Sequence, residues 1–470
     1  MIKARRLQTS FADGFIAEEV SDLWEPWMRQ ADRAIDDDVL LEIVQTALSA
    51  RAQKSKTRGR TATTAEVTLR LLLLKHIRGW SFETVHREVR SNLVYREFTR
   101  IGGGTVPDDK TMGRIARQLG PEVIEKLHRR VVEIAQGNQA VAGRKLRVDT
   151  TVVETNIHYP TDSKLINDGV RVLTRIMKKV AQQAVDLKTK VRDRTRSVKR
   201  RMLDVARASR DKSERGRRKM QDAYGKLLDA ASRVVGQANM VSDEIAGTVE
   251  RARQTVLDKA KQQLDEMIPR LRQVFKQARQ RVFEGNTRAE GKIVSVFEPQ
   301  TEVIRKGKAS KPTEFGKMIK IQEAENQIVT HYEVYDKRPS DSDLLTPSIE
   351  KHREIFSDAP HVVAADAGFF SAANEAKAKE LGVKRVSIPS RCTKSEKRKQ
   401  EQKSRWFKKA QKWRTGCEGR ISLLKRRHRL NRSLYKGQDG MKRWVGLGVI
   451  ADNLINLGQF MAKPPATAKS

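Results

Sequence analysis

Apolar residues recur with helical spacing through most of the first quarter of the chain. The clearest helix is predicted over a leucine-rich run, with Thr63 and Glu66 as a capping pair before it and Gly79 at its end. Ser81 is expected to cap a second helix, and a third is expected to begin at the following Asp-Asp pair. Short helices joined by short turns predict a compact helical module with helix-turn-helix rhythm.

After Arg144 the pattern changes from helical spacing to short stretches rich in β-branched residues. Strands are predicted at Lys145–Val153, Lys292–Phe297, Lys317–Glu323, Gln327–Val334, His361–Asp366 and Val383–Ile388. Helices are predicted over 341–355, 372–381 and 441–461. This alternation predicts an α/β fold class, with a mixed sheet flanked by helices.

A long stretch with narrow apolar stripes lies between the first two predicted strands. From Lys164 to about Phe283, apolar residues recur at the steps that are typical of a coiled-coil seam. The spacing predicts long antiparallel helices in a hairpin arm, a coiled-coil-like helical insertion. Its basic half, Arg171–Met220, holds 19 basic and 5 acidic residues. That charge fits either a solvated helix face or an arm that clamps DNA or joins subunits.

These patterns divide the chain into three expected domains. Residues 1–137 would form the N-terminal helical domain, and 164–284 would form the helical insertion. Residues 138–163 and 285–470 would together build the domain that contains the sheet.

The charge of the chain indicates a polyanionic partner. Its 470 residues include 95 Lys and Arg against 58 Asp and Glu, a net charge of +37. Nucleic acid is the first expectation, because phosphate contacts release counterions, and an anionic membrane surface is the second. No apolar stretch is long enough for a transmembrane helix, and the N-terminus lacks the apolar core of a signal peptide. With only two cysteines, a cytoplasmic protein without a disulfide framework is expected.

Two aspartates end predicted apolar strands and are the first candidates for chemistry. Asp149 lies in LRVDTT, and Asp366 lies in VVAADAGFF. A carboxylate at the end of a buried strand is costly unless a positive charge lies nearby, and a divalent cation supplies one. The alternative is an ordinary capping aspartate at a strand-to-helix turn. Two such acids in so basic a chain favour a site for phosphoryl transfer on nucleic acid, which uses a pair of metal ions.

Glu418 is the candidate for a third carboxylate ligand. It is the one acidic residue between Glu401 and Asp439, in a strongly basic stretch that is predicted to be helical. Arg414 and Lys425 share its side of that helix. The alternative for Glu418 is a plain salt-bridge partner, and Asp439 or Asp452 would then be the next candidates.

Several cations are candidates for DNA contact. On the third predicted helix, they lie on roughly one side of a helix-turn-helix-like unit. Near the acids, they would touch phosphates beside the metal ions. The first set is Lys110, Arg114 and Arg117, and the second is Arg414, Lys425 and Lys317. The alternative for each is an ordinary surface cation.

At these residues the chain resembles the DDE transposases of bacterial insertion sequences, most closely the ISNCY-like group. The resemblance covers nearly the whole chain. It is carried by VDTTVVETNIHYPTDSKL around Asp149, KPTEFGK at 311–317, ADAGFFSAAN around Asp366, and the Arg-x3-Glu-x6-Lys pattern centred on Glu418. The related pattern often begins with Tyr three residues before the Arg, where this chain has Gln411.

The resemblance implies an RNase H-like fold for the sheet domain and a DNA-binding role for the N-terminal helices. It also implies dependence on Mg²⁺ or Mn²⁺, with two ions held by Asp149, Asp366 and Glu418 as the catalytic triad. The implied partners are double-stranded DNA, both element ends and target, and further copies of the chain on that DNA. The implied location is the bacterial cytoplasm at the nucleoid.

Three functions are compatible with these features. The first is a transposase that binds terminal inverted repeats, cleaves DNA as a metal-dependent endonuclease and joins the new 3′ ends to target DNA. The second is an RNase H-like nuclease or resolvase that cuts without joining. The third is a basic coiled-coil DNA-binding protein without catalysis, whose carboxylates are structural.

Overall fold

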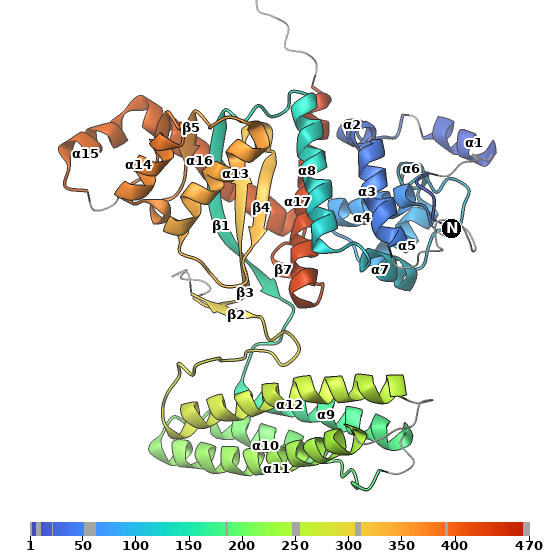
Figure 1. Cartoon of the computed structure of the whole chain (residues 1–470), viewed down its shortest axis with the longest axis vertical. Coiled ribbons are helices and arrows are strands. Elements are labelled where there is room, and N and C mark those ends of the chain that lie inside the picture. Colours follow the sequence, from blue (N-terminus) through green and yellow to red (C-terminus); the bar gives the residue numbers. More distant parts are fainter. Residues whose placement is uncertain are drawn as a thin grey trace, which may run out of the picture. The chain divides into compact units, whose positions relative to one another are not determined.

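The computed structural model describes residues 2–5, 11–20, 22–50, 63–183, 187–246, 254–305, 312–390 and 393–463. The chain divides into two compact units (Figure 1). The first combines Met1–Asn156 with Gly316–Ser470, and the second is Ile157–Phe315. The N-terminal helices and the sheet therefore share one unit, while the second unit interrupts the chain between two strands of that sheet.

Short helices fill the N-terminal part of the first unit. They are α1 (Phe11–Glu19), α2 (Pro26–Ile35), α3 (Asp38–Ser49), α4 (Ala65–Arg78), α5 (Phe82–Ser91), α6 (Leu93–Phe98), α7 (Asp109–Ala116) and α8 (Pro121–Gly137). The predicted stop at Gly79 is confirmed, since this glycine adopts the left-handed conformation at the end of α4. The cap of α4 is Thr64 and not the predicted Thr63. Glu66 then falls inside the first turn and pairs with Arg70 at 3.1 Å instead of closing a capping box.

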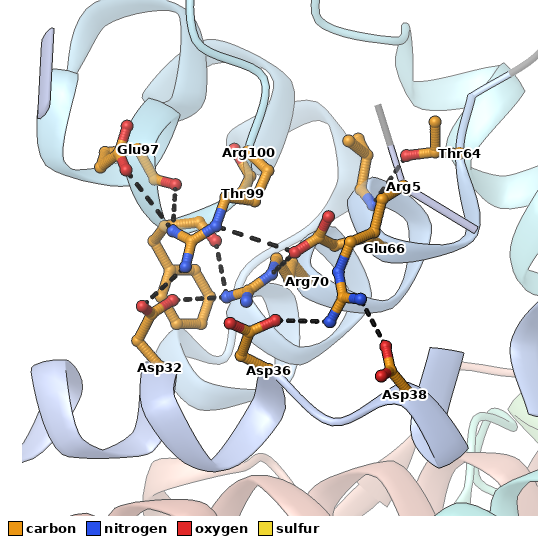
Figure 2. Close-up of polar contacts among 12 residues, drawn as sticks. Arg5, Asp32, Asp36, Asp38, Thr64, Glu66, Arg70, Glu97, Thr99 and Arg100 are labelled. Carbon is orange, nitrogen blue, oxygen red and sulfur yellow. Dashed lines mark hydrogen bonds and ion pairs between the residues drawn. The ribbon is translucent and has the colours of Figure 1, made fainter. Parts of the chain in front are cut away.

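A charged cluster lies within these helices (Figure 2). Arg70 is fully buried, and its guanidinium contacts the carboxylates of Asp32 and Glu66. Arg100 adds a 2.8 Å ion pair with the same Asp32. Because a buried charge is costly unless it is paired, these carboxylates make the buried arginine tolerable and fix α2 against α4.

A long C-terminal helix connects the N-terminal helices with the sheet. Helix α17 (Gly437–Met461) packs against α2, α4 and α8 and also against strand β4 (Val329–Val334). In Figure 1 it runs beside α8. At Gly458 a Cβ atom would lie 2.2 Å from the carbonyl oxygen of Trp27, so the close approach of α2 requires a glycine there. The helix is buried on most sides, as its predicted apolar character requires.

The sheet of the first unit mixes antiparallel and parallel strands in the order β4, β3, β1, β5, β6. Its further strands are β1 (Lys145–Thr155), β3 (Glu314–Glu323), β5 (Val362–Ala364), β6 (Arg385–Ser387) and the short β7 (Arg432–Ser433), which pairs with β1. Pairing is antiparallel between β1 and β3 and between β3 and β4, and it is parallel from β1 through β5 to β6. Its helices are α13 (Leu345–Phe356), α14 (Ala372–Glu380), α15 (Glu396–Lys403) and α16 (Arg405–Arg427). The predicted α/β class is confirmed.

One predicted strand is wrong. Residues 292–297 form no strand, although their β-branched alternation predicted one. The backbone of Ile293 is bonded to the side chain of Gln277 on the preceding helix, and the Ser295 hydroxyl accepts from the backbone of Phe297 and Glu298. These local partners satisfy backbone groups that a neighbouring strand would otherwise pair with.

The second unit contains a helical bundle where a two-helix arm was predicted. Its helices are α9 (Asp162–Gln183), α10 (Thr195–Ala208), α11 (Glu214–Ala246) and α12 (Gln254–Phe283), followed by the short strand β2 (Glu302–Ile304). Helix α9 packs against all three other helices, and all four contribute to one apolar core. A Cβ at Gly169 would lie 2.7 Å from Leu271, so α9 and α12 approach closely there. The narrow stripes therefore face one another in a bundle and not in a single seam.

Candidate active site

The two predicted aspartates lie at the same level of neighbouring strands. Strands β1 and β5 run parallel, with Arg147 opposite Ala364. Asp149 and Asp366 each follow two residues later, so both return to the same face of the sheet. Adjacent strands are about 4.8 Å apart. The register therefore brings two carboxylates, both half-buried, to the place where the end of β5 meets the middle of β1. The expectation that Asp149 ends its strand is wrong, because β1 continues to Thr155.

Both aspartates also bond to the backbone that follows them. Asp149 Oδ1 accepts from the amide of Thr150 at 2.7 Å, and Asp366 Oδ1 accepts from the amide of Ala367 at the same distance. Asp366 thereby caps a short 3-10 turn, Ala367–Phe369, as the capping interpretation expected. The bond orients each carboxylate but occupies only part of its four or so acceptor positions. Capping and cation binding are therefore compatible at these two residues.

Helix α16 crosses the sheet beside these strand ends. Gln411 donates to the carbonyl oxygen of Ser387 at 2.6 Å and to that of Ala365 at 3.5 Å. Its own Oε1 accepts from Arg414 Nε at 3.2 Å, and Arg414 Nη2 donates to Glu418 Oε1 at 3.1 Å. A continuous polar chain thus runs from the residue before Asp366 to Glu418. Gln411, at the position where related motifs have Tyr, is the residue that anchors this chain to the sheet.

Glu418 is more exposed than the two aspartates. Its side chain is 63% exposed and is paired with Arg414, whose own side chain is only 12% exposed. The salt-bridge alternative therefore describes the contact that the structure contains. The neighbouring Cys417 is buried toward the sheet; burial above all, and then the carboxylates of Glu323 and Asp149, raise the pKa of its thiol. Asp149 consequently lies near the segment of α16 that carries Glu418.

The donor set suits a hard divalent cation. Carboxylate oxygens are the ligands that Mg²⁺ and Mn²⁺ prefer, and the carboxylates of Asp149 and Asp366 both lie where the end of β5 meets β1. Across the described residues, no three His, Cys, Asp or Glu side chains are gathered closely enough to hold a metal ion. The carboxylates of the two aspartates are therefore suitable ligands for such a cation, while the carboxylate of Glu418 is paired with Arg414 in this structure.

Asp341 is an acid near Asp149 and Asp366 that the sequence analysis did not predict. Its Oδ1 accepts from the hydroxyl of Thr150 at 3.0 Å, and its Oδ2 lies 3.4 Å from where a Cβ of Gly368 would be. It therefore contacts residues beside both Asp149 and Asp366. Its signal in the sequence was its place as the first residue of a predicted helix, which also fits an acid in an ordinary first helical turn.

Two of the cations predicted to contact DNA lie on α7, and the third, Arg117, directly follows it. Lys110, Arg114 and Arg117 are all exposed, while Met112 and Ala116 hold the helix in the core. Helix α7 packs against α4 and α5. In the part of the chain that the structure describes, none of the three cations forms an ion pair.

The cations predicted near the acids have different surroundings. Lys317 is buried, and its ammonium donates to the carbonyl oxygen of Asp336, so its side chain is held against the end of β4. Arg414 is engaged by Gln411 and Glu418, and Lys425 is half-buried on α16. Burial of Lys317 on the central strand β3 was not visible in a sequence pattern that alternates polar and apolar residues.

Asp439 and Asp452, the alternative candidates for the third carboxylate ligand, have different surroundings. Asp452 is fully buried, with 2.9 and 3.0 Å bonds to Arg420 and a 3.4 Å contact to His428. These partners give it a structural role inside the first unit. Asp439 is exposed at the start of α17.

Comparison with known protein families gives two matches. Residues 25–118 match a transposase domain (DUF772), and residues 375–458 match a transposase DDE domain. The first match spans α2 to α7, and the second includes Glu418. No curated protein and no solved structure matches the chain. Among the described residues, none of the helices has the length and apolar character needed to cross a membrane.

Proposed function

We propose that the chain is an insertion-sequence DDE transposase that binds the terminal inverted repeats of its element, cleaves them and joins them to target DNA. The matches to a transposase domain and to a transposase DDE domain support this proposal. The observation that carries the chemistry is the parallel register of β1 and β5, because Asp149 and Asp366 each lie two residues beyond the paired Arg147 and Ala364. The ISNCY-like grouping remains an inference from the sequence motifs. The proposed location is the bacterial cytoplasm, on the DNA of the nucleoid.

The strand arrangement supports an RNase H-like fold for the sheet. Three antiparallel strands, β4, β3 and β1, are continued by β5 and β6 in parallel. Helix α13 connects the antiparallel part to β5, and α16 follows β6 and crosses the sheet beside β1 and β5. This arrangement places the end of β5 beside the middle of β1, where the two aspartates lie.

We propose that Asp149, Asp366 and Glu418 hold two divalent cations. Such ions, when bound, activate the attacking oxygen and stabilise the leaving oxygen of the phosphodiester. The chain's own contribution is to position the carboxylates. The amides of Thr150 and Ala367 orient the two aspartates, and Gln411 fixes Arg414 beside Glu418. No protein nucleophile is required for this reaction.

The N-terminal helices are proposed to supply site recognition. Sequence is read by contacts to base edges, whereas phosphate contacts position the protein without selecting a site. The exposed cations of α7 belong to a small helix that packs on α5, so they lie on a rigid surface. Because two ends must be brought together before joining, we propose that the chain acts as a homo-oligomer on DNA.

The first prediction concerns the acidic triad. Asp149→Ala, Asp366→Ala and Glu418→Ala should each reduce cleavage of a labelled element end in Mg²⁺ by more than about 100-fold, since each removes a cation ligand. DNA binding should persist, because the net positive charge of the chain is carried elsewhere. The measurement is the amount of nicked and joined product, with binding followed separately by gel shift.

Glu380→Ala provides the matched control, because Glu380 is an exposed acid on α14 that, within the described residues, forms an ion pair with Lys377 alone. It should cut at the wild-type rate. Normal cleavage by the Asp149 or Asp366 variant would refute the proposed active site. Nicked product without any joined product would favour the nuclease alternative, and binding without cleavage by the wild type would favour the non-enzymatic one.

A further inference from the structure

We propose that helices α9 and α10 of the second unit form a groove that binds the phosphate backbone of double-stranded DNA. This inference rests on the proposed function only in taking DNA as the partner. The groove has a volume of about 640 Å³ and is lined by six cationic and two acidic side chains. The cations are Arg171, Arg175, Lys178, Lys179, Arg196 and Lys199, and the acids are Asp168 and Asp193.

Most of the positive charge in the groove is uncompensated. Asp168 pairs with Arg171 at 3.4 Å, and Asp193 pairs with Lys178 at 2.6 Å. The remaining four cations are exposed, and within the described residues they form no ion pair. They are Arg175, Lys179, Arg196 and Lys199. A concave surface with unpaired charge of one sign concentrates a polyanion more strongly than a convex one does.

Asp193 compensates one cation of the groove and connects its two helices. One carboxylate oxygen accepts from Lys178 on α9, and the other accepts from the amide and the hydroxyl of Thr195 at the start of α10. These bonds lower the pKa of Asp193 to about 2, with the Lys178 contact as the largest cause. The acid therefore stays ionised and ties the two helices together at the groove.

The spacing of the cations fits a linear polyanion. Arg175 and Lys179, which form no ion pair within the described residues, lie four residues apart on one side of α9, so about 6 Å of that helix carries two uncompensated positive charges. The cations of α10 supply the second wall. Duplex DNA carries one phosphate per 3.4 Å of axis on each strand, so an extended row can meet several phosphates at once. A single small anion would engage only a fraction of this row.

Charge neutralisation in the full-length chain tests the groove. The variant replaces the four unpaired cations with Ala: Arg175→Ala, Lys179→Ala, Arg196→Ala and Lys199→Ala. Its affinity for a duplex of random sequence should fall on the order of tenfold or more at moderate salt. The slope of log affinity against log salt should become shallower by about 3, since each lost phosphate contact removes nearly one released counterion.

The control variant removes equal charge from the same bundle outside the groove. It replaces four cations of α12 that are also exposed and also unpaired within the described residues: Lys259→Ala, Arg272→Ala, Lys276→Ala and Arg279→Ala. Its affinity and salt slope should stay close to wild type. Helical circular dichroism should show that both variants are folded, and a milder pair, Lys179→Ala with Lys199→Ala, should give about half the loss of slope.

The outcomes separate the groove from the proposed function. Equal losses in the two variants, or no loss in either, would overturn the groove proposal. Cleavage of single ends by the wild type decides the proposed function independently, because none of the groove residues belongs to the sheet that carries the acids. A wild type that cuts while the groove variant binds DNA normally would refute the groove alone.

Discussion

At the scale of single residues, burial and partners decide what a charged side chain does. Asp452 and Asp149 are both aspartates on apolar elements, yet Asp452 is fully enclosed and paired with Arg420, whereas Asp149 is half-buried in the middle of β1. The first completes a buried ion pair, which is costly to break. The second keeps access to solvent, which a cation and a DNA strand both require.

Lys75 gives a prediction at this scale. Its ammonium lies 4.7 Å from the ring centroid of Trp444 and 5.2 Å from that of Tyr435. Burial, and then the charge of Arg429, lowers its pKa to about 7. An unfolded lysine titrates near 10.4, so between about pH 7 and 10 the unfolded chain holds a proton that the folded chain lacks. The free energy of unfolding should therefore rise with pH, by up to about 1.4 kcal/mol per pH unit from this group.

Lys75→Met removes that titration. Urea unfolding at pH 7 and pH 9 should show the wild type gaining about 2 kcal/mol relative to the variant. Lys126→Met, on the exposed side of α8, controls for the loss of one charge. Because it keeps Lys75, its free energy of unfolding should change between pH 7 and pH 9 by the same amount as that of the wild type. Parallel pH profiles for the wild type and Lys75→Met would show that Lys75 keeps its proton in the folded chain.

At the scale of elements, two basic helices are expected to contribute differently to DNA binding. Changing Arg114 and Arg117 on α7 to Ala should reduce discrimination between element ends and random DNA, because that helix is proposed to read sequence. Changing the exposed Lys408, Lys409 and Lys412 on α16 to Ala should weaken both about equally and flatten the salt dependence. Gel shifts with the two DNAs at several salt concentrations measure this. The same loss of discrimination in both variants would contradict recognition by α7.

The sequence predicted elements well where local signals and packing agree. Gly79 and Ser81 mark helix ends that the structure contains, because a left-handed glycine and a capping hydroxyl act locally. The sequence patterns gave wrong predictions where contacts with distant residues determine the local structure. Residues 292–297 have strand character but bond to Gln277, and Lys317 lies in a polar position yet is buried. The proximity of Asp149 to Asp366 follows from the strand register, which the sequence does not give. The position of Asp341 beside them follows from its hydrogen bond to Thr150, which the sequence does not give either.

At the scale of the whole molecule, the second unit interrupts a β-hairpin. Strands β1 and β3 are antiparallel neighbours, with Glu154 opposite Gly316, so the chain leaves and re-enters the sheet at nearly one point. Such an insertion leaves the pairing on either side intact. The bundle also has its own apolar core. Both features predict that the first unit folds without it.

Replacing residues 158–314 with a short Gly/Ser linker should therefore give a folded protein that still nicks single ends weakly. It should no longer pair two ends or join strands, since the basic helices that would hold the second DNA are gone. Thermal unfolding and product analysis measure the two effects. Normal end pairing by the deletion protein would contradict this role of the insertion, and an unfolded protein would place the bundle in the core of the fold.

Manganese binding tests the central claim most directly, namely that Asp149 and Asp366 form one cation site where the end of β5 meets β1. The measurement is a titration of the full-length chain with Mn²⁺, followed by electron paramagnetic resonance of the free ion. Wild type and Glu380→Gln should bind Mn²⁺ alike, whereas Asp149→Asn and Asp366→Asn should each weaken binding by at least about tenfold. Unchanged Mn²⁺ affinity in both aspartate variants would contradict the account.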